Sequence, residues 1–247
     1  MLPYLCWAAR SADCLTTSYY AIKEFCVSHD LKINPEKTQL IILKKPTKPI
    51  PEDFHLTLDN CIIKPQNTVK LLGVTLDQHL TFGPHIDCIS KKCQALLGIL
   101  ARATPHLPKE LLKLLYTALI RSHLEYCSSI FSTAAKTHLK KLDIIQRKAA
   151  RIIYRVPRDA HADLLLLFLN LDVLCDRRET HLIKLIKSFV SGRCHPAMPS
   201  FIKLRTDKTL AITQSRSTLG QRRPSVFGAT LYNQHLGLSS EFEDTDT

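Results

Sequence analysis

The stretch LKINPEKTQLIILKK, residues 31–45, has polar residues at positions that could take part in a reaction. Two short apolar runs flank a Pro turn at Asn34, and Lys37 and Thr38 open the second run. This arrangement is typical of the edge of an active site, where the end of a strand presents a cation. Whether the chain does chemistry therefore depends on which groups accompany Lys37.

The carboxylates that such a site needs are missing from the sequence. Asp30 and Glu36 flank Lys37, but one carboxylate at a strand edge binds magnesium too weakly for catalysis. No two adjacent aspartates occur anywhere in the chain. The stretch offers a cation without a metal-binding pocket beside it.

Basic residues are concentrated in the middle of the chain. Residues 84–158 hold 14 Lys and Arg against 4 Asp and Glu, a net charge of +10 out of +12 for the whole chain. Arg147, Arg151, Arg155 and Arg158 follow one another at steps of 4, 4 and 3, which places them on one side of a helix. Phosphate oxygens suit such a row, because each guanidinium donates twice to one anion.

The opposite side of the same helix is apolar. Leu142, Ile145, Ala149 and Ile152 lie there and are expected to pack. An ordinary solvated basic face of a bundle helix accounts for the arginine row equally well. The remaining basic candidates for nucleic-acid binding in this region are Lys91, Lys92, Lys140, Lys141 and Lys148.

The nine cysteines do not form a metal-binding pattern. Their number is odd and their spacing irregular, and neither Cys88 with Cys93 nor Cys194 with His195 has the spacing of a zinc site. Most stand in apolar runs, so we expect reduced, buried thiols in an intracellular protein. No secretory signal is visible, and the longest apolar run, 164–175, is too short to cross a membrane. We expect a nuclear or cytoplasmic protein, neither secreted nor membrane-bound.

Hydrophobic periodicity predicts a mostly helical α+β fold. Residues 15–29 fit an amphipathic helix, and the short runs 31–34 and 38–43 fit strands. A hairpin over 54–63 and a third strand over 69–76, interrupted at Gly73, complete a small antiparallel sheet.

From Pro84 the period becomes helical. Three helices are predicted over residues 85–103, 108–131 and 135–155, with the second central to a bundle, and two more around 160–171 and 176–191. The organisation expected is a sheet region at 1–83, a basic helical bundle at 84–158, additional helices at 159–204 and an irregular tail at 205–247.

Ordered blocks of the sequence resemble one known family. FCVSHDLKINPEKTQLI, VKLLGVTLDQHLTFGPHIDCISKKCQALLGILAR, LPKELLKLLYTALIRSHLEYCSSIF and LKKLDIIQRKAARIIY look like the C-terminal half of a non-LTR (LINE-type, Jockey- or CR1-like) retrotransposon reverse transcriptase. RSTLGQRRPSVFGATLYNQHLGL is similar to the closing segment of these polyproteins, with Tyr232-Asn233 where a Trp-Asn pair is usual. The resemblance runs from about residue 20 to residue 238.

The resemblance implies roles for several residues. Lys37 would lie near the leaving pyrophosphate at the end of the palm, and Asn34 and Thr38 would shape its turn. The LLGV block would be the primer-grip hairpin, in which Leu72 and Gly73 approach the primer. The helices after residue 84 would be the thumb, which holds the template–primer duplex by its backbone.

The family's catalytic aspartates are absent here. The complete enzymes hold two magnesium ions with a Tyr-x-Asp-Asp turn and an earlier aspartate. We therefore expect a truncated reverse-transcriptase-like protein that begins just past the active site, has no cofactor of its own and is inactive alone. It would keep sequence-independent binding to an RNA or DNA duplex backbone.

Two alternatives stay open from the sequence. One is an incomplete gene model of an active RNA-directed DNA polymerase, and the other is a domesticated protein-interaction module. No small-molecule substrate is evident. Open edges of the small sheet would favour self-association.

Overall fold

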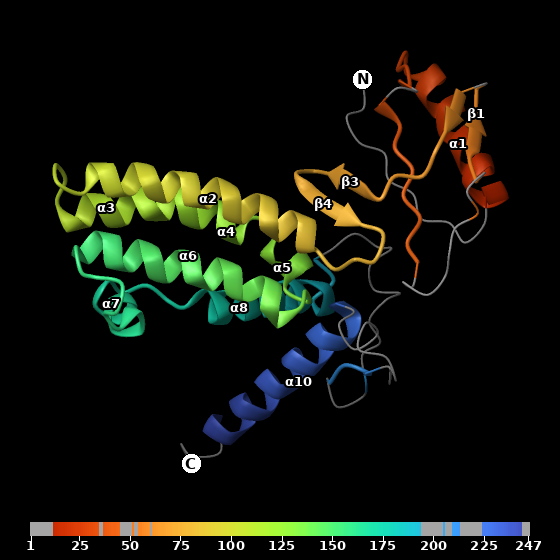
Figure 1. The fold of residues 1–247 in the computed structure, drawn as a ribbon. Coiled ribbons are helices and arrows are strands. Elements are labelled where there is room, and N and C mark those ends of the chain that lie inside the picture. Colours follow the sequence, from red (N-terminus) through yellow and green to blue (C-terminus); the bar gives the residue numbers. More distant parts are fainter. Residues whose placement is uncertain are drawn as a thin grey trace. The chain divides into compact units, whose positions relative to one another are not determined.

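The structure is a computed structural model that describes residues 12–34, 37–44, 51, 54–59, 61–193, 205, 209–212 and 224–243. The chain divides into two compact units, Met1–His85 and Ile86–Thr247. Figure 1 traces the elements of both. The mostly helical α+β fold expected from the sequence is confirmed, since helices dominate and the strands form two small antiparallel pairs.

The first unit is built on helix α1 (Ala12–Ser28) and the strands β1 (Leu56–Leu58) and β2 (Cys61–Ile63). Tyr19 of α1 is buried in a cluster with Leu56, Leu58 and Ile63. The Tyr19 hydroxyl also donates to Asp59 Oδ2 (2.8 Å), at the turn between β1 and β2. The predicted helix at 15–29 and the predicted hairpin are therefore both present, and they pack on each other.

The structure has a second hairpin where periodicity predicted a single third strand over 69–76 and where the resemblance implied a hairpin at the LLGV block. Strands β3 (Thr68–Leu71) and β4 (Val74–Asp77) pair antiparallel, with Leu71 opposite Val74. Leu72 and Gly73 form the turn with positive φ angles of 46° and 84°. Two consecutive residues with positive φ fit the two-residue turn that matches the twist of a hairpin. Gly73 thus reverses the chain and does not merely interrupt a strand.

The two strands predicted at 31–34 and 38–43 are not formed by the described residues there. One isolated bridge joins Leu40 to Pro65 in parallel orientation. Leu40 packs against the cluster of Tyr19, so the apolar run serves as packing and not as a ladder strand.

Asp77 and His85 order the chain between β4 and helix α2 (Gly83–Ala103). The buried Asp77 carboxylate accepts hydrogen bonds from the backbone N–H groups of His79, Thr81 and Phe82 and from the Thr81 hydroxyl. Thr75 donates its N–H to His85 Nδ1 at 3.3 Å.

The second unit is a bundle of helices. After α2 come α3 (Lys109–Leu115), the π-helical segment η2 (Tyr116–Arg121), α4 (Ser122–Glu125), α5 (Ser128–Phe131) and α6 (Lys136–Tyr154). Helices α7 (Ala162–Phe168) and α8 (Leu174–Val190) follow, and α6 packs against α3, α7 and α8. The core contains Leu112, Tyr116, Leu142 and Ile145, each no more than 1% exposed.

The single central helix predicted over 108–131 is wrong in two respects. It is divided into α3, η2, α4 and α5, with a break at Cys127, whose φ is 55°. Only one of its faces is buried, because Leu111, Leu114 and Leu119 are exposed. The apolar content of the segment therefore predicted more burial than the structure shows.

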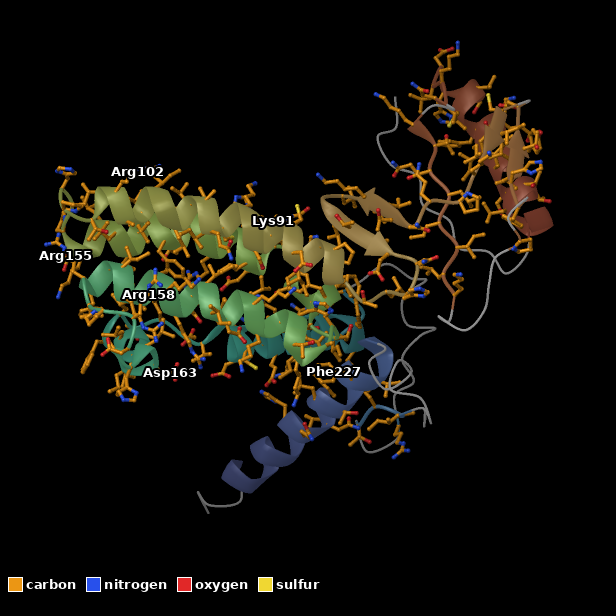
Figure 2. All side chains as sticks on the ribbon, in the orientation of Figure 1. Lys91, Arg102, Arg155, Arg158, Asp163 and Phe227 are labelled. Carbon is orange, nitrogen blue, oxygen red and sulfur yellow. The ribbon has the colours of Figure 1, made fainter. Side chains whose placement is uncertain are left out.

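The irregular tail predicted for residues 205–247 is contradicted by helix α10 (Pro224–Glu243), which packs on α8. Ala229 and Tyr232 are buried with Leu182 and Ile186, and Phe227, labelled in Figure 2, packs against them. Gly228 permits the close approach, since an added Cβ would lie 2.3 Å from Ile186 Cδ1.

Two further expectations concern the burial of the thiols and the membrane-spanning potential of the helices. Of the described thiols, Cys26 and Cys93 are buried as expected, whereas Cys88 and Cys175 are exposed. In the described part of the chain, no helix combines the length and apolar character needed to span a membrane.

Candidate nucleic-acid interface

Helix α6 has two distinct faces, as its pattern predicted. Leu142, Ile145 and Ala149 are buried and Ile152 is half-buried. The opposite arc carries Lys136, Lys140 and Lys148, with Ile144 between them. The helix is anchored on one side and charged on the other.

The first two arginines of the predicted row are held by the segment that follows α6. Arg147 Nε lies 3.1 Å from Asp163 Oδ1 at the start of α7. Arg151 Nε donates to the carbonyl oxygen of Ala160 at 3.0 Å. Because α7 packs directly on α6, these two side chains join the helices together.

The last two arginines do not continue the helical row. Helix α6 ends at Tyr154, and Arg155 is its C-cap with φ 57° and ψ 38°. Its Nη2 donates to the carbonyl oxygens of Thr104 (2.5 Å) and Leu107 (3.2 Å), between α2 and α3. Arg158 lies beyond the helix and is exposed. Figure 2 shows Arg155 at the end of the bundle where α2 turns towards α3. The prediction of one continuous helical stripe is therefore wrong.

Lysines occupy the open positions instead. Lys91 and Lys92 on α2 and Lys140 and Lys148 on α6 are exposed, and none has an ion pair with another residue that the structure describes. Lys141 differs, since its Nζ lies 2.5 Å from Asp87 Oδ1 and so ties α6 to α2. Four of the five lysine candidates are thus available to an outside anion.

Arg102 is a basic residue of this surface that sequence reasoning missed. It lies eleven residues after Lys91, about three helical turns, so both side chains stand on the same exposed face of α2. Figure 2 shows both on the outer side of that helix. The spacing of eleven residues from Lys91 is the sequence signal that identifies Arg102.

The electrostatics around Lys92 are those of a positive surface. Burial, and then repulsion from Lys92, lowers the pKa of His123, so this histidine adds no charge at neutral pH. The lysines hold compact, hydrated charges on flexible stems. Exposed lysines of this kind are suited to phosphate oxygens and carry no geometry for reading base edges.

The catalytic candidates lie in the first unit. The carbonyl oxygen of Asn34 accepts from the backbone N–H of Lys37 (3.3 Å) and from the Thr38 hydroxyl (3.0 Å). Asn34 and Thr38 thus close the turn, and Lys37 is exposed at its edge. In the described ranges, no three His, Cys, Asp or Glu side chains gather as a metal-binding group.

Leu72 and Gly73 stand at the tip of the β3–β4 hairpin. Both are exposed, and the Leu72 side chain is 57% accessible. A leucine in the left-handed region is uncommon and strained. The hairpin therefore presents an apolar side chain at its tip, in a turn where a small polar residue would be favoured.

Comparison with known proteins finds RNA-directed DNA polymerases of mobile elements that are similar in sequence to this chain. The chain is 26% identical over 211 residues to the probable RNA-directed DNA polymerase from transposon BS of Drosophila melanogaster, covering 76% of this chain and 22% of that protein. It is 30% identical over 155 residues to the RNA-directed DNA polymerase from mobile element jockey of the same species, covering 58% and 16%. The X-element polymerase is 26% identical over 150 residues, covering 58% and 16%.

No family model and no solved structure matches the chain. The chain spans about a fifth of the length of the curated relatives it matches. Matches to the polymerases of three different mobile elements confirm the resemblance drawn from the sequence blocks. The chain is similar, over most of its length, to part of the RNA-directed DNA polymerases of non-LTR retrotransposons.

Proposed function

We propose that this chain binds the backbone of an RNA or DNA duplex without regard to sequence, as part of a reverse-transcriptase-like protein. The observation that carries the proposal is the set of exposed lysines Lys91, Lys92, Lys140 and Lys148, which have no ion pair with a described residue. The similarity to RNA-directed DNA polymerases supports it, since those proteins act on nucleic acid. Polyanion binding of this kind gains its free energy from counterion release.

The arginines contribute less to this surface than the sequence predicted. Arg147, Arg151 and Arg155 each donate to an acceptor within the second unit. These hydrogen bonds fix the orientation of the guanidinium groups and occupy part of their donors. The exposed lysines face no such competition, so they carry the interface.

The experiment compares two variants of equal charge change. Lys91, Lys92, Lys140 and Lys148 are changed together to alanine, and the control changes Lys32, Lys64, Lys184 and Lys187, all of them exposed. Affinity for a labelled mixed-sequence RNA–DNA duplex is measured by fluorescence anisotropy. We expect the first variant to lose at least about tenfold in affinity and the control to lose far less. Equal losses would mean that net charge alone acts and would contradict the proposal.

We propose further that the chain does not polymerise by itself. The sequence has no pair of adjacent aspartates, and the palm residues for which the resemblance offers counterparts, Lys37, Asn34 and Thr38, include no carboxylate. Primer extension by the purified chain with magnesium and deoxynucleotides should give no product. Extension that exceeds a no-protein control would contradict this second proposal and leave duplex binding unaffected.

A further inference from the structure

One part of this basic chain is acidic. Residues 159–176 contain Asp159, Asp163, Asp172 and Asp176 and not a single Lys or Arg, although the chain has 34 basic residues. The segment includes α7 and the turn that leads into α8. Nucleic acid is repelled by such a segment, so the duplex-binding surface does not explain it.

A groove of about 620 Å³ lies within this segment. Leu164, Leu167 and Val173 contribute apolar surface to it, and Asp163 and Asp176 contribute charge. Leu164 is 55% exposed and Leu167 is 71% exposed, which is unusual for large apolar side chains that sit together. Figure 2 labels Asp163 on α7.

The floor of the groove is fixed by a buried side chain from α6. Gln146, 1% exposed, donates from Nε2 to the carbonyl oxygen of Asp172 (2.9 Å) and accepts from the N–H of Leu174 (3.0 Å). Asn170 turns the chain with φ 51°, and Leu171 donates to the carbonyl oxygen of Leu166 at 3.0 Å. The groove is therefore formed before any partner arrives.

The rim of the groove carries carboxylates that remain exposed to solvent. Arg177 lines the groove, but its guanidinium is bound by Glu125 and by Asp172. The Asp163 and Asp172 side chains remain 68% and 72% exposed despite their ion pairs. Asp176 has no ion pair in the part of the chain that the structure describes. A cationic ligand would meet exposed carboxylates around an apolar centre.

The groove is too open for a small molecule. Binding sites for such ligands bury most of the ligand surface, whereas the leucines here stand at the margin and remain largely exposed. An amphipathic helix places apolar anchors at three- and four-residue spacing and carries basic residues beside them. That combination matches both the exposed leucines and the aspartates.

We propose that this groove docks a basic amphipathic segment of a partner protein. Apolar side chains of the segment cover Leu164 and Leu167, and its Lys or Arg residues pair with Asp163 and Asp176. The groove lining includes none of the four lysines of the proposed duplex interface.

The test uses the full chain and a defined probe. The probe is a fluorescent 18-residue peptide of leucine and lysine with leucines at helical spacing, and its matched control replaces every lysine with glutamate. Binding is measured by anisotropy for the wild type, for the double variant Leu167→Gln/Asp176→Asn, and for a control double variant on α3, Leu114→Gln/Glu110→Gln. All four positions are exposed, so folding is not at stake.

We expect the groove variant to weaken lysine-peptide binding about tenfold and the α3 variant to leave it unchanged within about twofold. The glutamate peptide should not bind. Equal binding of both peptides, or equal loss in both variants, would overturn the proposal. So would concentration-dependent self-association, measured by sedimentation velocity, that Leu167→Gln abolishes, because the occupant would then be a second copy of the chain.

Discussion

Arg155 donates from Nη2 to the backbone carbonyl oxygen of Thr104, 2.5 Å away. This contact joins the end of α6 to the end of α2. An arginine that the sequence assigned to phosphate binding thus has a structural role, and the same holds for Arg151 with Ala160. The distinction between structural arginines and available lysines leads to separate expectations for stability and for binding.

Changing Arg155 to alanine should lower the free energy of unfolding by about 1–2 kcal/mol, because two carbonyl oxygens lose a charged donor. Duplex affinity, measured well below the unfolding transition, should stay within about twofold. Urea unfolding followed by circular dichroism supplies the first quantity. Arg158→Ala, at an exposed position beyond the helix, is the control and should stay within about 0.5 kcal/mol. A large loss of affinity with unchanged stability would restore the original role of Arg155.

Changing Gln146 to alanine should destabilise the second unit by about 2–3 kcal/mol. The change leaves the buried N–H of Leu174 and the carbonyl oxygen of Asp172 without their partner. Ile144→Ala on the exposed face of the same helix should cost about 0.5 kcal/mol or less. Similar urea midpoints for the two variants would show that the two hydrogen bonds of Gln146 contribute nothing to stability.

His85 should make the stability of the chain depend on pH. Burial, and then repulsion from Lys70, lowers the pKa of His85 below its ordinary value of 6.5. The unfolded chain then binds a proton more readily, so the contribution of His85 is complete above pH 6.5 and is lost as the pH falls through the folded pKa. Between about pH 7.5 and about pH 5 the wild type should lose more stability than His85→Gln. Parallel losses in both proteins would contradict the assignment.

The hairpin tip should respond in opposite directions to two substitutions. Leu72→Asn should stabilise the chain by about 0.5–1 kcal/mol, because asparagine tolerates the φ of 46° better than leucine. Gly73→Ala should cost about 1 kcal/mol at its φ of 84°. Thermal unfolding midpoints measure both, and a destabilising Leu72→Asn would refute this reading of the turn.

The docking of α10 should depend on Asn233. Its side-chain amide donates to the carbonyl oxygen of Leu210 (2.9 Å) and accepts from the Leu210 N–H (2.8 Å), as a strand neighbour would. In Asn233→Ala, hydrogen exchange at Leu210 and along α10 should speed up while α6 stays protected. The exposed neighbour Gln234 provides the control variant, Gln234→Ala. Unchanged exchange at Leu210 would contradict the role of the amide.

Local periodicity was sufficient to predict the helices that pack through one apolar face. α1, α2, α6 and α8 begin and end within a few residues of the predicted positions. The buried residues of α6 followed from the same pattern, because one apolar stripe at helical spacing indicates both the helix and the face that packs.

The contacts between elements could not be predicted in this way. Whether Arg147 meets phosphate or Asp163 depends on where α7 folds back, and nothing local to α6 records that. Gly228 packs against Ile186 and Asn233 binds Leu210, and both partners are distant in sequence. Helix α10 was therefore missed. Periodicity missed the turn at Leu72 because a leucine is an improbable turn residue, although the resemblance implied a hairpin there.

The salt dependence of duplex binding shows whether the exposed lysines of α2 and α6 contact the phosphate backbone. The logarithm of the association constant is measured against the logarithm of the salt concentration for the wild type and for the variant with Lys91, Lys92, Lys140 and Lys148 changed to alanine. If these lysines neutralise phosphates, the slope becomes shallower by about 0.9 for each lysine removed on a DNA duplex. A slope identical to that of the wild type would show that the lysines do not touch the backbone and would contradict the proposed interface.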